Sequence, residues 1–228
     1  SGEIDAYSLE KRFIRKDGGV VPTAIDVKCV RQADGVPEYF IATVQDITER
    51  KLAEQRIHRL TRMYSALSEC NQAIVRCTSH EELFPQVCRF AVDYGGMKLA
   101  WIGLLEKDTQ LVRPVATFGE DADYLQRTQG SADAESPFGK GATGTAIRER
   151  RPIWILDYLK DPRTAPWHEH AAQAGWGAVA ALPLIRHDEV IGALVLYAAA
   201  GETFDEEIRN LLIEMANDIS FALTAFAK

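Results

Sequence analysis

The chain has 228 residues, which is enough for one sizeable hydrophobic core and a second, smaller folded unit. Its formal net charge of -7 argues against a nucleic-acid-binding protein, which usually carries a basic face. The longest nearly uncharged apolar stretch, residues 190–200, is shorter than the roughly 20 residues that cross a bilayer, and it reads as a buried strand. We therefore expect neither a nucleic-acid partner nor a membrane-spanning segment.

Three alternating runs near the N-terminus predict an antiparallel meander. The runs cover residues 7–15, 20–31 and 38–45. Asp17-Gly18-Gly19 separates the first two runs and Asp34-Gly35 separates the second two, and both sequences are strong signals for hairpin turns.

The segment Asp46-Ile47-Thr48-Glu49-Arg50-Lys51 joins the last of these strands to a long helical pattern. Asp46 can accept hydrogen bonds from the first helical turn, and Glu49 can reach back to the amide of Asp46, as in a capping box. A meander that ends in this motif resembles, over residues 7–51, the C-terminal half of a PAS sensor domain, the PAC motif. The resemblance implies that two earlier strands and several short helices would build the PAS ligand cavity, and the given sequence begins after those elements. We therefore expect residues 1–48 to be half of a PAS domain without a ligand site.

The helical pattern over residues 49–76 carries an apolar seam, with spacings of three and four residues over nearly three heptads. The seam consists of Ile57, Leu60, Tyr64, Leu67, Asn71 and Ile74. Asn71 would fix the register of a two-stranded coil, because a buried amide prefers to face its own copy. We expect a parallel coiled coil in a homodimer; the alternative is that the stripe packs on its own globular domain. The PAS resemblance also implies such a signalling helix, since PAS domains are commonly joined to the next module by one.

The four cysteines, Cys29, Cys70, Cys77 and Cys88, show no C-x-x-C spacing. The sequence therefore indicates neither a zinc site nor a disulfide framework, and it favours a reducing, cytoplasmic setting.

From residue 79 onward the patterns of helices and strands predict an α+β domain. A helix precedes Gly95-Gly96, and the expected strands cover residues 99–105, 111–118, 153–156, 179–185 and 190–197. A final amphipathic helix covers residues 205–226. Shorter helices and loops fill residues 120–150 and 160–177.

Five short segments in this order of elements resemble a GAF domain. They are residues 99–104 (Leu-Ala-Trp-Ile-Gly-Leu), 141–144 (Gly-Ala-Thr-Gly), 152–157 (Pro-Ile-Trp-Ile-Leu-Asp), 181–184 (Ala-Leu-Pro-Leu) and 190–194 (Val-Ile-Gly-Ala-Leu). The likeness covers about residues 65–228, and we assign residues 77–228 to the domain, with a first helix that begins near residue 65. It implies a central antiparallel sheet, with the terminal helices on one face and ligand-enclosing loops on the other.

Two other motifs have better explanations than the sites they resemble. Residues 139–144 match the G-x-G-x-x-G pattern of dinucleotide-binding sites, but a polar loop precedes them instead of a strand. A glycine loop that opens a short helix is the better interpretation. His168-Glu169-His170 has no third ligand at a convincing spacing, so we assign no metal. The sequence identifies no cofactor, since the cyclic-nucleotide signature and the bilin attachment pair of GAF domains are absent.

Aromatic residues gather near the segments that would cover a GAF cavity. The candidate ligand pocket comprises Trp101, Phe118, Trp154, Asp157, Arg163, Trp167, His168 and Trp176. Aromatic walls with few basic groups suit a planar or heterocyclic small molecule better than a strongly anionic one. The alternative is that these rings fill the core under a long loop.

Together the resemblances imply a non-catalytic sensory fragment that passes a signal through a dimeric helix to an output domain of a longer protein. A cyclic di-GMP synthase or phosphodiesterase, with a GGDEF or EAL domain, is the implied output, and a sensor histidine kinase is the alternative. An enzyme that uses the GAF cavity directly is disfavoured, because the motif regions contain no paired carboxylates, Ser-His-Asp set or pocket cysteine.

Overall fold

The computed structural model describes residues 5–128, 130–202 and 204–226, and it divides into two compact units, Ser1–His58 and Arg59–Lys228. The boundary falls within one long helix, α1 (Thr48–Arg76), so each unit includes part of that helix. Within the described residues no helix combines the length and the apolar character needed to cross a membrane.

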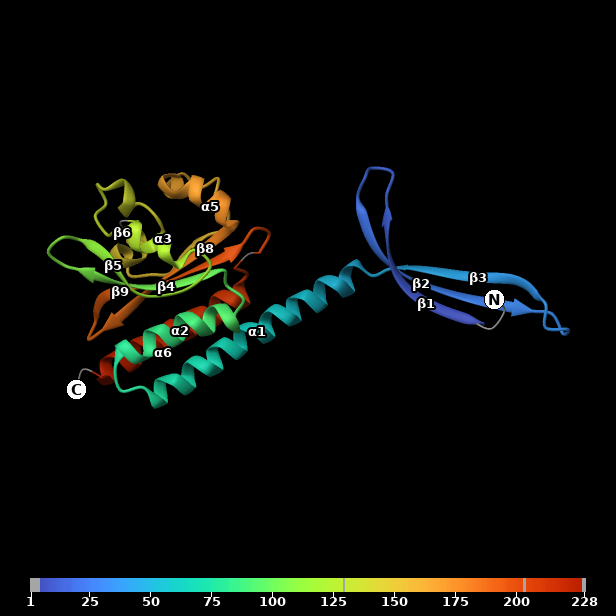
Figure 1. Ribbon diagram of the computed structural model, residues 1–228, viewed down its shortest axis with the longest axis horizontal. Helices are drawn as coiled ribbons and strands as arrows, with labels where there is room; N and C mark the ends of the chain where they lie inside the picture. The colour runs from blue at the N-terminus through green and yellow to red at the C-terminus, as the bar shows by residue number, and fades with distance from the viewer. Residues whose placement is uncertain (1–4, 129, 203, 227–228) are drawn as a thin grey trace. The chain divides into compact units, whose positions relative to one another are not determined.

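The first unit contains a three-stranded antiparallel sheet, as the sequence predicts (Figure 1). Its strands lie in the order β1 (Ala6–Ile14), β2 (Val20–Arg31) and β3 (Pro37–Asp46). Gly18 and Gly35 take the left-handed conformation in the turns, with φ of 86° and 85°. Among the described residues before α1, only Thr23, Cys29 and Ile47 are buried. This sheet therefore has almost no hydrophobic core of its own.

The start of α1 differs from the expected capping box. Asp46 Oδ1 accepts hydrogen bonds from the backbone amide of Thr48 at 2.9 Å and from its hydroxyl at 2.6 Å, and these bonds hold the pKa of Asp46 below its ordinary value. In a capping box the side chain of the third helical residue bonds the amide of the N-cap residue. Because the helix begins at Thr48, Glu49 is its second residue and does not occupy that position. Glu10 of β1 pairs with Arg50 and Lys51, which ties the first strand to the helix.

The second unit is built on a six-stranded antiparallel sheet in the order β6-β5-β4-β9-β8-β7. The strands are β4 (Leu99–Glu106), β5 (Leu111–Gly119), β6 (Gly130–Ser131), β7 (Ile153–Ile155), β8 (Trp176–Arg186) and β9 (Glu189–Ala199). One face is covered by α1, α2 (His80–Asp93) and α6 (Glu206–Phe226) (Figure 1). The other face carries α3 (Ala122–Arg127), α4 (Ala142–Glu149), α5 (His168–Ala174) and the 3-10 helices η1 (Pro137–Gly139) and η2 (Pro162–Trp167). The expected α+β fold, with an antiparallel sheet and flanking helices, is confirmed.

Two hydrophobic cores lie on opposite faces of this sheet, because successive side chains of a strand alternate between its faces. On β9, Leu194 and Leu196 belong to the core under α1, α2 and α6, which we call the helix-side core. Val195 and Tyr197 belong to the core under α3, α4 and α5, the loop-side core. Alternate residues along a strand therefore enter different cores.

The apolar seam of α1 is divided between two environments. The buried face of the helix consists of Met63, Ala66, Leu67, Cys70 and Ala73, which join the helix-side core. Leu60 and Ile74 pack against the same core, whereas the side chains of Ile57 and Tyr64 are exposed. The alternative weighed from the sequence, packing on the chain's own domain, therefore applies to Leu60, Leu67 and Ile74. Leu67, which is 6% exposed, also lies at the edge of an open groove beside Tyr64 and Asn71, so the coil between copies stays a prediction.

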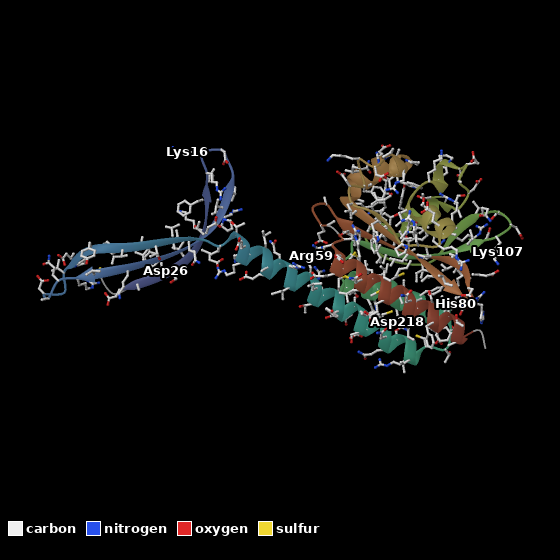
Figure 2. The ribbon with its side chains drawn as sticks, turned by 180° about the vertical axis from the view of Figure 1, so that it is seen from behind. Lys16, Asp26, Arg59, His80, Lys107 and Asp218 are labelled. Atoms are coloured by element: carbon white, nitrogen blue, oxygen red, sulfur yellow. The ribbon has the colours of Figure 1, made fainter. Side chains whose placement is uncertain are left out.

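Ion pairs hold the helical layer and the sheet turns at the surface. Arg59 of α1, labelled in Figure 2, pairs with Asp205 immediately before α6 at 3.6 Å. Lys107, in the turn after β4 and also labelled there, pairs with Glu189 at the start of β9 at 2.6 Å. Exposed pairs of this kind each stabilise a fold by less than about 1 kcal/mol, so the two cores dominate its stability.

Candidate functional site

A cavity of about 50 Å³ lies between the loop-side face of the sheet and the segments that cover it. Its lining residues are Trp101, Val112, Pro114, Tyr124, Leu125, Thr128, Gly130, Phe138, Gly141, Ala142, Thr143, Gly144, Tyr158, Thr164, Trp167, Trp176, Val179 and Tyr197. Among the described side chains of this lining none carries a charge, and most are aromatic, aliphatic or hydroxylic. Such a lining is typical of a site for a small organic molecule.

The floor of the cavity comes from the central strands. Trp101 on β4, Trp176 on β8 and Tyr197 on β9 are each buried in the loop-side core. The rings of Trp176 and Tyr197 lie 4.2 Å apart between centroids. Gly103 is required beside them, since a Cβ at that position would come within 2.6 Å of the Trp101 ring. The floor is therefore a fixed aromatic surface.

Tyr158 follows β7 and completes this aromatic cluster. Its ring meets Trp176 edge-on at 5.9 Å and lies 5.8 Å from Tyr197. Burial raises the pKa of Tyr158 above its ordinary value, and it raises the pKa of Tyr197 to about 12. Both phenols therefore stay protonated at neutral pH, and the site disfavours negative charge.

The wall on the α3 side is built by a stacked pair. Tyr124 and His170 have ring centroids 3.5 Å apart and an interplanar angle of 2°. His170 also meets Trp176 edge-on at 5.2 Å. Its Nε2 lies 3.9 Å from the carboxylate of Asp121, beyond hydrogen-bond distance. The stack joins α3 to α5 around the floor.

The roof is formed by two aromatic rings from different segments. Phe138 of η1 and Trp167 of η2 meet edge-on with centroids 6.0 Å apart. Trp167 lies directly over Gly141, where a Cβ would come within 2.8 Å of its ring. The glycines of the G-x-G-x-x-G segment therefore permit close packing. Gly141 leaves space for the Trp167 ring, and Gly144 lies against the carbonyls of Gly139 and Ser131.

His168 supports the roof from behind. Its Nε2 lies 3.0 Å from Thr164 Oγ1 and 3.1 Å from the carbonyl of Asp161. The Thr164 hydroxyl donates to the carbonyl of Tyr158 or to that of Asp161, and Thr164 is 1% exposed. His168 and His170 therefore serve separate structural roles at the two ends of one helical turn.

The candidate residues from the sequence separate into two groups. Trp101, Trp167 and Trp176 line the cavity. The remaining candidates are not in its described lining: Phe118, Trp154, Asp157, Arg163 and His168. Asp157 pairs with Lys160 at 2.9 Å and Arg163 pairs with Asp161 at 2.6 Å, and both candidates face solvent. Phe118 lies on β5 and is 37% exposed.

Trp154 lies on the opposite face of the sheet from the cavity. Its neighbours on β7, Ile153 and Ile155, enter the loop-side core, so alternation turns Trp154 toward the helix-side core. There its ring lies 5.7 Å from that of Phe204. The aromatic lining residues Tyr124, Phe138, Tyr158 and Tyr197 were not among the candidates from the sequence. Only the position of Tyr197 could have been predicted, because Tyr197 and Val195 lie two residues apart on β9 and therefore point to the same face of the sheet.

Two indole N–H groups in the floor have no hydrogen-bond partner among the described residues. Trp176 Nε1 and Trp101 Nε1 are both buried and unpaired, and the two residues are 1% and 5% exposed. The Tyr197 hydroxyl lies beside the Trp101 indole without hydrogen-bond geometry, which leaves Trp176 as the clearer case. Each buried donor without an acceptor costs about 1–3 kcal/mol, so unpaired donors in one cavity call for an explanation.

Comparison with known proteins identifies the domain that holds this cavity. Residues 77–224 match the model of the GAF domain family. The GAF domain of an Acinetobacter phosphoenolpyruvate-protein phosphotransferase is 15% identical and has a TM-score of 0.57, over 72% of this chain and 93% of that one. Free methionine-R-sulfoxide reductase from Neisseria meningitidis is 17% identical with a TM-score of 0.57, over 72% and 90%. At these identities the likeness shows the fold.

A curated protein matches a shorter stretch more closely. The probable diguanylate cyclase DgcE of Escherichia coli (strain K12) is 51% identical over 55 residues. The match covers 24% of this chain, and it spans 5% of the length of that protein.

Proposed function

Since this chain belongs to the GAF domain family, we propose that its sensory domain binds a small molecule in the loop-side cavity and passes the signal to an output domain. The observation that carries this proposal is the buried aromatic cavity with unpaired indole donors. A pocket with aromatic walls and a few convergent polar groups is the usual form of a small-molecule site.

The strands under the cavity provide a route for the signal. Trp176 and Val179 of β8 line the cavity, and further along the same strand the amide of Ile185 donates to Ser220 Oγ of α6 at 3.0 Å. A ligand that moves β8 would therefore act on α6 through a direct hydrogen bond. Because α6 is the last helix described, it is the element that would contact a following domain.

We favour a binding role over catalysis in the cavity. A GAF-fold reductase of the thiol type needs cysteines that face the cavity, whereas Cys70, Cys77 and Cys88 lie in the helix-side core. Burial raises the pKa of Cys70 and of Cys88 to about 12, so neither is a thiolate at neutral pH. For these thiols to act as catalysts, they would have to lie on the cavity side of the sheet and have a much lower pKa.

The parent protein that we propose is a diguanylate cyclase or cyclic di-GMP phosphodiesterase. The short stretch of similarity to DgcE supports this assignment, and a sensor histidine kinase is the alternative. We also propose that residues 1–48 are the C-terminal half of a PAS domain, supported by the meander and the Asp46 turn. A GGDEF or EAL domain encoded after Lys228 would agree with the first proposal, and a kinase core there would contradict it.

The partner that we propose for the helical face is a second copy of the chain. Tyr64 and Val75 of α1 are 60% and 85% exposed, and Phe221 of α6 is 76% exposed. Tyr64 and Val75 line an open groove that also includes Asn71 and Glu214. Asn71 lies in this groove at a seam position, where facing amides of two copies would fix the register of the pair.

Tryptophan fluorescence across a metabolite library tests the ligand proposal. A genuine ligand should quench or shift the emission of the full chain, because three indoles line the cavity. Trp167→Ala and Trp176→Ala should each weaken its binding at least about tenfold, a loss of roughly 1.4 kcal/mol. A ligand whose affinity neither variant changes binds elsewhere and would contradict the proposal.

A further inference from the structure

The unpaired donor of Trp176 restricts the chemistry of a ligand in the loop-side cavity. Trp176 lines the cavity and is 1% exposed, and its buried indole N–H has no acceptor among the described residues. An indole nitrogen can only donate, so the missing partner must be an acceptor such as a carbonyl oxygen. Trp101 presents a second donor of the same kind, with the Tyr197 hydroxyl beside it.

The same cavity disfavours a charged ligand. No charged side chain occurs in its described lining, so an ionic group would lose its hydration without a counter-charge. The raised pKa values of the buried Tyr158 and Tyr197 have this cause: the surroundings favour the neutral form of each phenol. An acceptor that enters this cavity must therefore belong to an uncharged molecule.

The aromatic rings around the cavity favour a ligand that carries a ring of its own. The rings of Trp176, Tyr197 and Tyr158 form an aromatic floor, and Trp167 closes the cavity from above. At about 50 Å³ the cavity is smaller than the roughly 150 Å³ that holds benzene in an engineered protein core. A ring must displace the roof, and Phe138 and Trp167 are both incompletely buried. Ring-sized ligands should therefore bind with a movement of η1 and η2.

We propose that the cavity takes an uncharged planar molecule with a carbonyl acceptor, an aromatic amide or lactam, whose oxygen accepts from Trp176 Nε1. This assignment rests on the proposed sensory function and adds the chemical class of the ligand. The Tyr197 hydroxyl lies at the same floor as a further polar group.

Four ring compounds of similar size test the proposal on the full chain: benzamide, benzoate, benzamidinium and toluene. They share one ring and differ in charge and in the acceptor. Proton–nitrogen NMR of the indole N–H groups gives the readout, with signals assigned by Trp→Phe replacement. Benzamide should shift the Trp176 signal and bind at least about tenfold more tightly than the other three, a difference of roughly 1.4 kcal/mol.

Matched variants separate the donor from the ring. Trp176→Phe keeps an aromatic ring and removes the N–H, so it should weaken benzamide about tenfold and leave toluene unchanged. Trp154→Phe is the control, because Trp154 lies on the other face of the sheet and should affect neither compound. If Trp176→Phe does not fold, the titration of the wild-type Trp176 signal still decides the matter.

Three results would overturn the acceptor assignment. They are equal or tighter binding of benzoate or benzamidinium, equal binding of toluene, and no movement of the Trp176 signal with any of the four compounds. The proposed sensory function would survive each of them, because it depends on the metabolite screen with Trp167→Ala and Trp176→Ala. If the metabolite screen finds no ligand but benzamide binds as predicted, the acceptor assignment stands and the proposed sensory function is contradicted.

Discussion

The guanidinium of Arg209 on α6 lies over the indole ring of Trp154 on β7, 5.3 Å from the ring centroid. Arg209 also donates from Nε to the carbonyl of Phe204 at 2.7 Å, which fixes its side chain beside the start of the helix. The flanking residues of Trp154 on β7 enter the loop-side core. This short strand therefore contacts the core around the cavity with one face and the start of α6 with the other.

Replacing Trp154 should loosen the start of α6. Trp154→Ala removes a cation–π contact and a half-buried ring, so we predict a loss of about 2 kcal/mol in the free energy of unfolding. Hydrogen exchange should become faster in the first turns of α6. Trp167→Ala is the matched control, because it removes an indole from the roof and should leave exchange in α6 unchanged. Unaltered exchange in Trp154→Ala would show that β7 does not hold the helix.

A methyl group at position 141 should displace the roof. In Gly141→Ala the new Cβ would lie within 2.8 Å of the Trp167 ring, so the ring must move outward. We predict a red-shifted tryptophan emission and a loss of about 1–2 kcal/mol in stability, as for other substitutions that overpack a site. Gly19→Ala is the control, since its nearest contact is the flexible side chain of Asp17. Identical emission of Gly141→Ala and the wild type would contradict the assigned role of this glycine.

Stability should fall at high pH because of the buried phenols. The pKa of Tyr197 is raised from 10.0 to about 12, so the folded state holds its proton where the unfolded state releases it. Its contribution is complete below the ordinary pKa and is lost as pH rises through the folded pKa. Denaturant titrations should show this loss between about pH 10 and 12, at up to about 1.4 kcal/mol per pH unit for one group. Tyr197→Phe should flatten the slope in this window, and an equal slope in both proteins would refute the assignment.

Substitutions on the exposed face of α1 should separate dimerisation from folding. If the chain is a homodimer through the groove of α1 and α6, Tyr64→Glu with Val75→Glu should give monomers of unchanged stability, because both residues are exposed. Leu67→Glu should instead destabilise the domain, since it places a charge in the helix-side core. Sedimentation of the wild type as a monomer at high micromolar concentration would rule out the dimer.

The sheet of the first unit should exchange its amide hydrogens much faster than the second unit does. Large apolar side chains are exposed on its strands, among them Phe13, Phe40 and Ile41 at 42%, 66% and 49%. With so little buried surface, strands β1 to β3 open at little cost unless another chain covers them. Hydrogen exchange in residues 7–45 that is as slow as in residues 179–197, measured on a monomer, would contradict this expectation.

The sequence predicted the strands and helices well, because their periodic patterns are local. It predicted the cavity only in part. Alternation along a strand shows which side chains share a face, but it does not show which face of the sheet lines the cavity. Trp154 shows the difficulty: both faces of β7 are buried, so its apolar neighbours gave no direction. The seam of α1 had a related ambiguity, because the same spacing suits a coil between copies and a helix packed on its own domain. The Tyr124–His170 stack joins two non-repetitive segments, and no local pattern indicates such a contact.

Hydrogen exchange on the full chain, with and without a ligand from the fluorescence screen, tests the position of the sensory site most directly. Binding should slow exchange in η2 and α5, which cover the cavity, and in the first turns of α6, where Arg209 and the preceding Phe204 contact Trp154 of β7. Exchange that slows along the groove of α1 and α6 while η2 and α5 remain unchanged would place the ligand on the helical face, and it would contradict the central claim that the loop-side cavity is the sensory site.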